Sequence, residues 1–404
     1  MKGWQVKKIG EVCTLKSGTT VNKNLEEISG DIPYLKVADL NIPGNNPEIV
    51  TSSRFLNQKS LKENSIFPVG TTIFPKRGGA ILTNKKRLTT VPICTDLNIM
   101  GVIPSNILLP KFLYFYFLNI DMRELGSGSS IPQINNYDIE PLIISFPPLP
   151  EQKRIVAILD EAFEGIDKAI TNNKKNLANS RELFESYLKG IFTQRGEGWK
   201  ENRLGNLSEV QSGGTPLCSK PEYWGGQIAW YSSGELNNLY TTAPERNITD
   251  EGLKNSNAKL FPKGSLLMGM YDTAALKMSI LDREATFNQA IAGVRPNEKI
   301  DLIFILHAIN FLKPEILNLR RGVRQKNLSL QKIKDIILPL PELKEQQRVV
   351  RDLASIREET QRLEAIYRQK IAALSELKQS ILQKAFTGEL TADTPKTVKE
   401  ELAA

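Results

Sequence analysis

The chain contains an internal repeat with a period of about 194 residues. Trp4 returns as Trp199, and the Ser-Gly-Thr-Thr at 17–20 returns as the Ser-Gly-Gly-Thr at 212–215. Further matches keep the same order in both halves, at offsets between about 190 and 196: 67–70 with 261–264, 98–101 with 290–293, and 148–156 with 339–350. So many collinear matches indicate a tandem duplication of one structural unit, whereas the sequence between them has diverged.

Each repeat has a globular part followed by a helical part. Residues 1–150 and 199–341 are rich in Gly, Pro and Asn between short β-type runs, which predicts two compact mixed domains with much strand. Residues 151–198 and 342–390 predict one long helix each, the first with a short link, and 391–404 form a polar tail. The expected fold class is α+β, with two β-rich domains separated by two long helices.

The two helical parts carry the apolar pattern of a coiled coil. Each follows a Pro-Leu-Pro, at 148–150 and 339–341, and proline is tolerated at the first turn of a helix. At ~1.5 Å per residue each helix would be roughly 60–70 Å long. Spacings near three and four give a narrow stripe, formed by Ile155, Leu159, Ala162, Ile166, Ala169 or Ile170, Leu177, Phe184, Leu188 and Ile191 in the first helix, and by Val349, Leu353, Ile356, Leu363, Tyr367, Ile371, Leu374, Leu377 and Ile381 in the second.

A stripe of this kind needs a partner. The other copy is the obvious one, and a pseudo-two-fold axis between the halves would make the helices antiparallel and hold the domains apart at opposite ends. The alternative is that each helix packs on its own domain.

The positive charge lies in the globular parts. Residues 1–150 contain 16 Lys and Arg against 12 Asp and Glu, and residues 199–341 contain 18 against 14. The helical remainder is balanced, with 8 against 8 in 151–198 and 11 against 11 in 342–404. The net charge of +8 is therefore shared equally by the two domains. Two DNA-binding modules on an uncharged spacer would show this pattern, because phosphate contacts require Lys and Arg.

Basic and polar clusters inside the domains are the candidate DNA contacts. Lys-Arg-Gly-Gly at 76–79 couples cations to flexible backbone, and Gln325 is of a type that can recognise adenine. Hydroxyls and amides in 126–133 suit phosphate contacts. The candidates are Lys76, Arg77, Lys85, Lys86, Arg87, Ser127, Ser129, Ser130, Gln133, Arg320, Arg321, Arg324, Gln325 and Lys326. Each cluster could equally be ordinary surface. For 17–20 and 212–215 we expect turns that place a strand, with phosphate contact as the second interpretation.

Catalytic motifs are missing from the sequence. The single histidine, His307, lies in an apolar run that predicts a packed helix residue. No GxxxxGK[ST] loop occurs, and the Phe-Pro-Pro-Leu at 146–149 lacks the Asn or Asp of an adenine-methylase loop. Cys13, Cys94 and Cys218 have no metal-ligand spacing, and no segment has the apolar length of a membrane span. We expect a non-catalytic cytoplasmic protein without a bound metal or a membrane partner.

Three features together resemble the specificity subunit of type I restriction-modification enzymes. They are the helix entrances at 148–156 and 339–350, the exit Ile-Leu-Gln-Lys-Ala-Phe-Thr-Gly-Glu-Leu at 381–390, and the Trp-x-x-x-x-Ile/Leu-Gly that opens each half before Ser-Gly-x-Thr. The resemblance spans residues 1 to about 390, although the exit is reduced to Phe-Thr-Gln-Arg at 192–195 in the first half.

The resemblance implies a role in recognising DNA. Each globular part would be a target recognition domain for one half of a split double-stranded sequence, and the helices would set the gap between the halves. Two methylation subunits would dock on the helical regions and methylate adenine N6, and two restriction subunits would join them. S-adenosylmethionine, ATP and Mg²⁺ would belong to those partners, so this chain would bind no cofactor. Alternatives are a stand-alone bipartite DNA-binding protein and, from another class, an enzyme fused to a recognition region.

Overall fold

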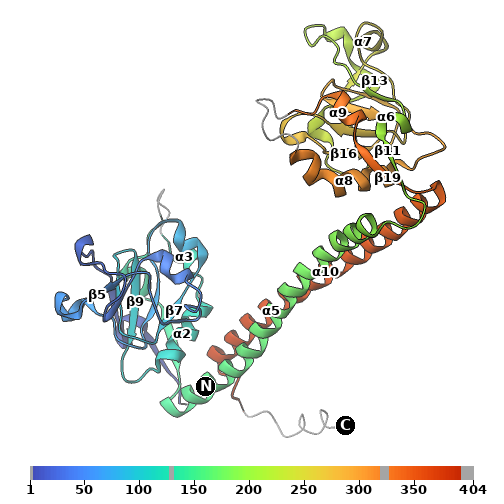
Figure 1. The fold of residues 1–404 in the computed structure, drawn as a ribbon. Coiled ribbons are helices and arrows are strands. Elements are labelled where there is room, and N and C mark those ends of the chain that lie inside the picture. Colours follow the sequence, from blue (N-terminus) through green and yellow to red (C-terminus); the bar gives the residue numbers. More distant parts are fainter. Residues whose placement is uncertain (1–2, 127–131, 319–326, 393–404) are drawn as a thin grey trace, which may run out of the picture. The chain divides into compact units, whose positions relative to one another are not determined.

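The computed structural model describes residues 3–126, 132–318 and 327–392 (Figure 1). The chain divides into two compact units: Met1–Lys174 with Gln369–Ala404 form unit 1, and Lys175–Arg368 form unit 2. Each unit therefore contains one globular domain and parts of both long helices. The α+β fold with paired long helices that the repeat predicts is confirmed.

Unit 1 is built on one mixed sheet and a smaller one. Its strands are β1 (Gln5–Lys8), β2 (Cys13–Ser17), β3 (Ile32–Leu35), β4 (Glu48–Ile49), β5 (Phe55–Leu56), β6 (Thr72–Pro75), β7 (Arg87–Thr89), β8 (Cys94–Thr95), β9 (Ile99–Pro104) and β10 (Ile143–Phe146). The five-stranded sheet has the order β2-β9-β6-β7-β4, the three-stranded sheet has the order β5-β3-β8, and β1 pairs with β10. Within these sheets β3 runs parallel to β8, and β4 runs parallel to β7.

In the part of the chain that the structure describes, unit 1 contains four short α-helices and parts of the two long ones. The helices are α1 (Ile9–Val12), α2 (Pro110–Asn119), α3 (Met122–Leu125), α4 (Asn136–Ile139), and the unit's parts of α5 (Leu149–Gln194) and α10 (Leu343–Thr387). Of these, α2 packs on the five-stranded sheet. Six consecutive residues of α2, Phe112 to Phe117, are buried. A helix that is apolar all round belongs in a core, and α2 packs beneath the sheet with Phe117 5.7 Å from Phe74 between ring centroids.

Unit 2 repeats the same topology. Its strands are β11 (Lys200–Arg203), β12 (Val210–Ser212), β13 (Trp224–Tyr231), β14 (Arg246–Ile248), β15 (Leu266–Gly269), β16 (Met278–Ile280), β17 (Ala285–Phe287), β18 (Ile291–Val294) and β19 (Ile337–Leu340). The orders β12-β18-β15-β16, β14-β13-β17 and β11-β19 match those of unit 1 strand for strand, except that β4 has no counterpart among them. Its helices are α6 (Leu204–Leu207), α7 (Asp250–Lys254), α8 (Leu302–Asn318) and α9 (Leu330–Lys334). The duplication in sequence is therefore a duplication in fold.

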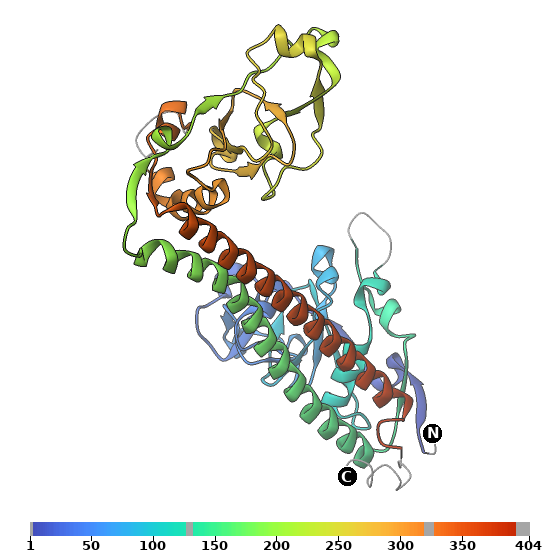
Figure 2. The ribbon, with the colours of Figure 1, turned by 90° about the vertical axis from the view of Figure 1, so that its right-hand side faces the viewer.

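The two long helices pack against each other in both units (Figure 2). In unit 1, Ile155, Leu159 and Phe163 of α5 share a core with Leu382 and Ala385 of α10. In unit 2, the later residues Leu188 and Phe192 of α5 share a core with the earlier Val349 and Leu353 of α10. Within unit 1 the Arg154 guanidinium reaches the Thr391 carbonyl, and further along α5 Asp167 pairs with Lys378, so the helices are antiparallel.

The buried stripe differs in detail from the heptad expectation. Phe163 is buried and its neighbour Ala162 is only partly so. Leu377 is 48% exposed, and at the end of the stripe Leu382 is buried while Ile381 is only partly so. An α-helix with 3.6 residues per turn drifts away from a strict seven-residue repeat, which moves residues such as Leu377 off the contact face.

A buried glutamine joins the start of each long helix to its own domain. The Gln152 side chain is fully buried, accepts a hydrogen bond from the Leu109 N–H at 2.8 Å, and donates to the carbonyls of Ile107 (2.9 Å) and Pro147 (2.8 Å). Gln346 repeats this arrangement in unit 2: it accepts from the Asp301 N–H (2.8 Å) and donates to the Pro341 carbonyl (2.9 Å). The amide thus satisfies backbone groups at the N-terminal end of α2 or α8 and at the entrance of the long helix.

Replacing either glutamine by leucine should destabilise the protein. Gln152→Leu would roughly keep the side-chain volume but remove the partner of the buried Pro147 carbonyl and of the partly buried Leu109 N–H and Ile107 carbonyl, which should cost about 3 kcal/mol. Chemical unfolding of the full chain measures the loss, with Gln379→Leu as control because Gln379 is exposed on α10. Equal unfolding curves for Gln152→Leu and Gln379→Leu would contradict this role.

The single histidine is buried in the core of unit 2. His307 on α8 is 4% exposed, its ring centroid lies 6.1 Å from that of Phe184, and its Nδ1 has no hydrogen-bond partner within the described residues. Burial, and then the Arg357 guanidinium, lower the pKa of His307 from 6.5 to about 4.

The low pKa of His307 predicts a loss of stability in acid. Below pH 6.5 the unfolded chain takes up a proton that the folded protein accepts only near pH 4, so the free energy of unfolding falls as the pH drops through this window, by up to about 3 kcal/mol. We expect His307→Leu to lose less stability than the wild-type chain between pH 7 and pH 4.5 in urea unfolding. Parallel pH dependences of the two proteins would refute the assignment.

No helix among the described residues has the length and apolar character needed to cross a membrane.

Candidate nucleic-acid interface

In unit 1 several strands finish at one edge, which we call the loop end. It comprises the segments 17–20, 36–39, 76–78, 96–98 and 132–133. β2, β3, β6 and β8 end there and β9 begins there, because Ser17 and Pro75 lie opposite the first residues of β9 and Leu35 pairs in parallel with Thr95. Backbone hydrogen bonds close this edge: Gly18 N–H to Ile99 carbonyl (3.0 Å), Thr19 to Thr95 (2.8 Å), Lys76 to Asn98 (2.8 Å) and Asp96 to Leu35 (2.9 Å).

The loop end of unit 2 has the same four hydrogen bonds. It comprises 212–215, 232–235, 270–271, 288–290 and 327–328. The bonds run from Gly213 N–H to the Ile291 carbonyl (3.2 Å), Gly214 to Phe287 (2.9 Å), Met270 to Ala290 (2.9 Å) and Asn288 to Tyr231 (2.9 Å). The backbone scaffold of this edge is therefore duplicated, while most of its side chains differ.

The repeated Ser-Gly begins the first segment of each loop end, directly after β2 or β12. A Cβ on Gly18 would lie 2.0 Å from the Asp96 carbonyl oxygen, and a Cβ on Gly213 would lie 2.0 Å from that of Phe287, so both positions require glycine. A capping aromatic residue then holds this segment: the Tyr34 hydroxyl donates to the Thr19 carbonyl (3.2 Å) and the Trp230 indole N–H donates to the Gly214 carbonyl (3.0 Å). Both stretches are irregular segments that directly follow a strand, β2 or β12, and neither contains an assigned turn; phosphate contact by them stays a prediction.

The structure brings three of the predicted contact residues together. Arg77 and Gln133 form a β-bridge, the Ile134 N–H donates to the Lys76 carbonyl (2.9 Å), and Arg77 is exposed. The Lys76 ammonium is mostly buried and donates to the Ser17 hydroxyl at 2.8 Å. Burial, and then the charge of Arg77, lower the pKa of Lys76.

Two of the three residues of the second basic cluster, Lys86 and Arg87, are buried in the domain. Lys86 is 2% exposed and donates to the Asn84 side chain and the Ile120 carbonyl, both at 2.6 Å; burial lowers its pKa to about 8. Arg87 is buried and donates to the Leu40 carbonyl (3.1 Å), and Lys85 donates to the Asn41 side-chain oxygen. DNA contact by Lys86 or Arg87 would require these internal bonds to break, and the contacts assigned to this cluster stay predictions.

The remaining predicted contacts lie outside the described residues. They are Ser127, Ser129, Ser130, Arg320, Arg321, Arg324, Gln325 and Lys326. Their flanking residues attach to the loop ends: Gly78 N–H donates to the Pro132 carbonyl (2.8 Å), and Leu328 N–H donates to the Met270 carbonyl (2.8 Å). The described residues Pro132 and Leu328, which follow these segments in the chain, therefore lie at the loop end of their own domain.

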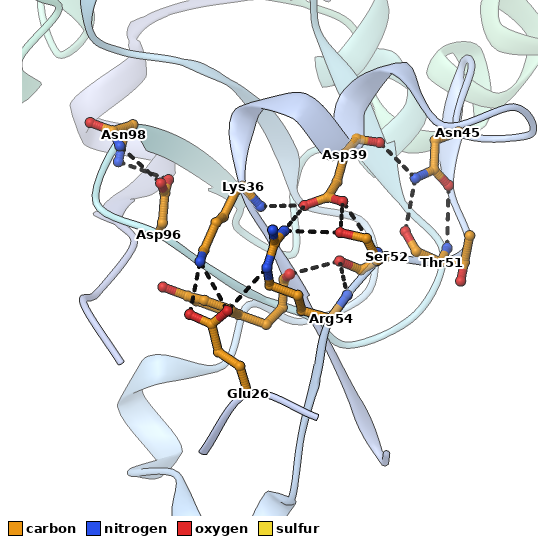
Figure 3. Close-up of polar contacts among 11 residues, drawn as sticks. Glu26, Lys36, Asp39, Asn45, Thr51, Ser52, Arg54, Asp96 and Asn98 are labelled. Carbon is orange, nitrogen blue, oxygen red and sulfur yellow. Dashed lines mark hydrogen bonds and ion pairs between the residues drawn. The ribbon is translucent and has the colours of Figure 1, made fainter. Parts of the chain in front are cut away.

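Sequence reasoning missed an arginine that both domains hold beside the loop end. In unit 1, Glu26 lies between two cations, with the Lys36 ammonium at 2.8 Å and the Arg54 Nε at 3.0 Å (Figure 3). In unit 2, Arg246 occupies the equivalent place on β14, opposite Trp230, with its guanidinium 3.5 Å from the centroid of the Trp224 ring. Arg54 lies opposite Tyr34, and Arg246 lies opposite Trp230. Tyr34 and Trp230 are equivalent in the repeat, so the repeat could have shown that the two arginines are equivalent as well.

The described residues of both loop ends include hydrogen-bonding side chains, and positively charged side chains lie in or beside each loop end. Within the described ranges no group of three or more His, Cys, Asp or Glu side chains could hold a metal ion, and the single histidine is buried in the core. Positioned Lys and Arg side chains, hydroxyls and amides on a rigid backbone edge suit phosphate and base contacts.

The comparisons with known proteins agree with this fold. The family model for the type I restriction modification DNA specificity domain matches residues 1–179 and again 196–373. The specificity subunit of the EcoR124I/EcoR124II type I restriction enzyme of Escherichia coli is 30% identical, over 61% of this chain and 63% of that protein. The MjaIX specificity subunit of Methanocaldococcus jannaschii is 24% identical, over 96% of this chain and 94% of its own length.

Solved structures share the fold along nearly the whole chain. A chain from a structural study of complex assembly in the type I restriction-modification system superposes with a TM-score of 0.75 at 21% identity, covering 96% of this chain and 99% of that one. The HsdS subunit from Thermoanaerobacter tengcongensis gives a TM-score of 0.63 at 22% identity, covering 96% and 98%. The chain therefore belongs to the type I restriction-modification DNA specificity family, whose members are non-catalytic specificity subunits.

If the loop end of unit 1 binds DNA, Arg77→Ala should weaken that binding. Loss of one phosphate contact should reduce the affinity several-fold. It should also reduce the slope of log affinity against log salt concentration by about one. Fluorescence anisotropy at several KCl concentrations measures both quantities. Lys7→Ala is the control, because it removes another exposed cation of the same domain, on β1 and outside the loop end. The same loss of affinity in both variants would point to overall charge and against a local contact.

Proposed function

We propose that the two loop ends are the DNA-recognition surfaces of the chain and that each one binds half of a split double-stranded target. The observation that carries this proposal is the duplicated hydrogen-bond scaffold with different side chains: Lys76 and Asn98 in unit 1 stand where unit 2 has Met270 and Ala290. Two copies of one scaffold can bind the same kind of polymer, and different side chains on them would select different bases. The target would then be asymmetric.

Arg54 and Arg246 would position the DNA backbone. Glu26 holds one of them and Trp224 stacks on the other, so both guanidiniums are ordered before binding. An ordered arginine loses less conformational freedom when it contacts a phosphate. The net surplus of positive charge in each domain supports the same role.

The long helices would set the separation of the half-sites and carry the partner proteins. α5 and α10 are continuous over 46 and 45 residues, which corresponds to about 70 Å each at ~1.5 Å per residue. Two methylation subunits would dock on them and modify adenine N6 in each half-site, and two restriction subunits would complete the complex. Those partners would use S-adenosylmethionine, ATP and Mg²⁺, and this chain would bind none of them. The complex would act in the cytoplasm, where the DNA is.

A stand-alone bipartite DNA-binding protein is the competing proposal. It would use the same loop ends but no methylation subunit. Co-purification of a tagged chain from its own cells separates the two, because a specificity subunit would bring a methylation subunit with it.

A genome-wide map of N6-methyladenine tests the proposed function directly. In cells that express the chain with its partners we expect a split motif, two short defined blocks around a fixed run of unspecified bases, and this motif should disappear when the gene is deleted. Restoring the gene should restore it. An identical map with and without the gene, in cells whose methylation subunit is active, would refute the proposal.

A further inference from the structure

The turn at 288–290, which precedes β18, carries Gln289 at a position where the equivalent turn of unit 1 has a different residue. Asn288 Oδ1 accepts a hydrogen bond from the Ala290 N–H (3.1 Å), and in unit 1 Asp96 Oδ1 accepts in the same way from the Asn98 N–H (3.0 Å). The same side-chain-to-backbone turn therefore fixes both segments. The middle residue of the turn is Gln289 in unit 2 and Leu97 in unit 1, and it takes no part in closing the turn.

Gln289 lines a polar hollow of about 550 Å³ at the loop end of unit 2. Gly213 and Gly214 line this hollow with backbone alone. Neither position has room for a side chain, because a Cβ would lie 2.0 or 2.3 Å from neighbouring backbone atoms. The walls of the hollow carry Thr215, Asn257 and Lys259. The hollow thus has a rigid base and exposed amide, hydroxyl and ammonium groups.

The amide of Gln289 is oriented before any ligand arrives. The Thr215 hydroxyl donates to Gln289 Oε1 at 2.6 Å, while the Gln289 side chain as a whole is exposed. This bond directs Oε1 toward Thr215 and thereby fixes the orientation of the whole amide, including Nε2. A carboxamide oxygen has two lone pairs, so Oε1 can still accept a second hydrogen bond while Nε2 donates.

We infer that Gln289 is a specificity-determining residue that recognises an adenine in the half-site bound by unit 2. This inference rests on the proposed function. A glutamine amide accepts from adenine N6 and donates to adenine N7 in the major groove. Lys259, on the wall of the same hollow, would contact an adjacent phosphate.

Unit 1 lacks this recognition element. Leu97 offers no hydrogen bond, and the amide nitrogen of the next residue, Asn98, already donates to Asp96 Oδ2 at 2.8 Å. The two half-sites are therefore recognised differently at the equivalent position, although the backbone of the two turns is the same.

Two substitutions of Gln289 test the inference in the assembled complex with its methylation subunit. Gln289→Leu keeps the size and removes the amide, so one position of the second half-site should lose its preference for adenine, by about tenfold or more in competition binding with duplexes that differ at that position. Gln289→Glu replaces the donor by an acceptor, so the preference at the same position should move toward cytosine, whose N4 donates to a carboxylate. The first half-site should be unchanged in both variants.

Methylation maps and competition binding give the readout, with Gln227→Leu as the matched control. Gln227 is an exposed glutamine of the same domain, on β13 and four residues before the end of that strand. A uniform loss of affinity on all duplexes in Gln289→Leu, with a wild-type melting curve, would overturn the inference, and so would an unchanged preference at every position. If the wild-type chain gave no gene-dependent split motif, the proposed function itself would fail, which is a different result.

Discussion

The hydrogen bonds of one buried glutamine in each unit connect the domain to its long helix. Gln152 and Gln346 are fully buried, and each uses both ends of its amide on backbone groups from the entrance of the long helix and from the chain just before α2 or α8. An unpaired buried amide or carbonyl is costly, so these bonds fix the direction in which the helix leaves the domain. A long helix can hold its domain in a fixed orientation only if this junction is rigid.

At the loop ends the backbone structure is the same in both units, while most of the side chains differ. Four backbone hydrogen bonds and a glycine without room for a Cβ hold each edge, and none of them depends on the side chains of residues such as Lys76, Met270 or Gln289. Because the backbone carries the structure, a side chain there can change with little effect on stability. Under the proposed function, this arrangement would allow one scaffold to recognise different bases in its two copies.

Part of the fold and part of the site were predictable from sequence. The repeat, the long helices and their antiparallel pairing follow from local spacing and from two-fold symmetry. A basic cluster in the sequence gave Lys76 and Arg77 as candidate contacts, and the structure places both at the loop end. The neighbouring cluster shows the limit of this reasoning. Lys86 and Arg87 look like surface cations in sequence, yet they are buried with backbone carbonyls as partners. Composition cannot distinguish a cation that faces solvent from one that lies under a helix.

The sequence by itself determined the duplication, the division of each copy into a domain and a helix, and the place where each helix begins, because these depend on residues close together in the chain. Only the tertiary structure decided which polar side chains share an edge. Thr215 and Gln289 are 74 positions apart and Lys76 and Ser17 are 59 apart, and the sheet order brings each pair into contact. Contacts of that separation depend on strand pairing across the whole domain, and local sequence patterns do not report it.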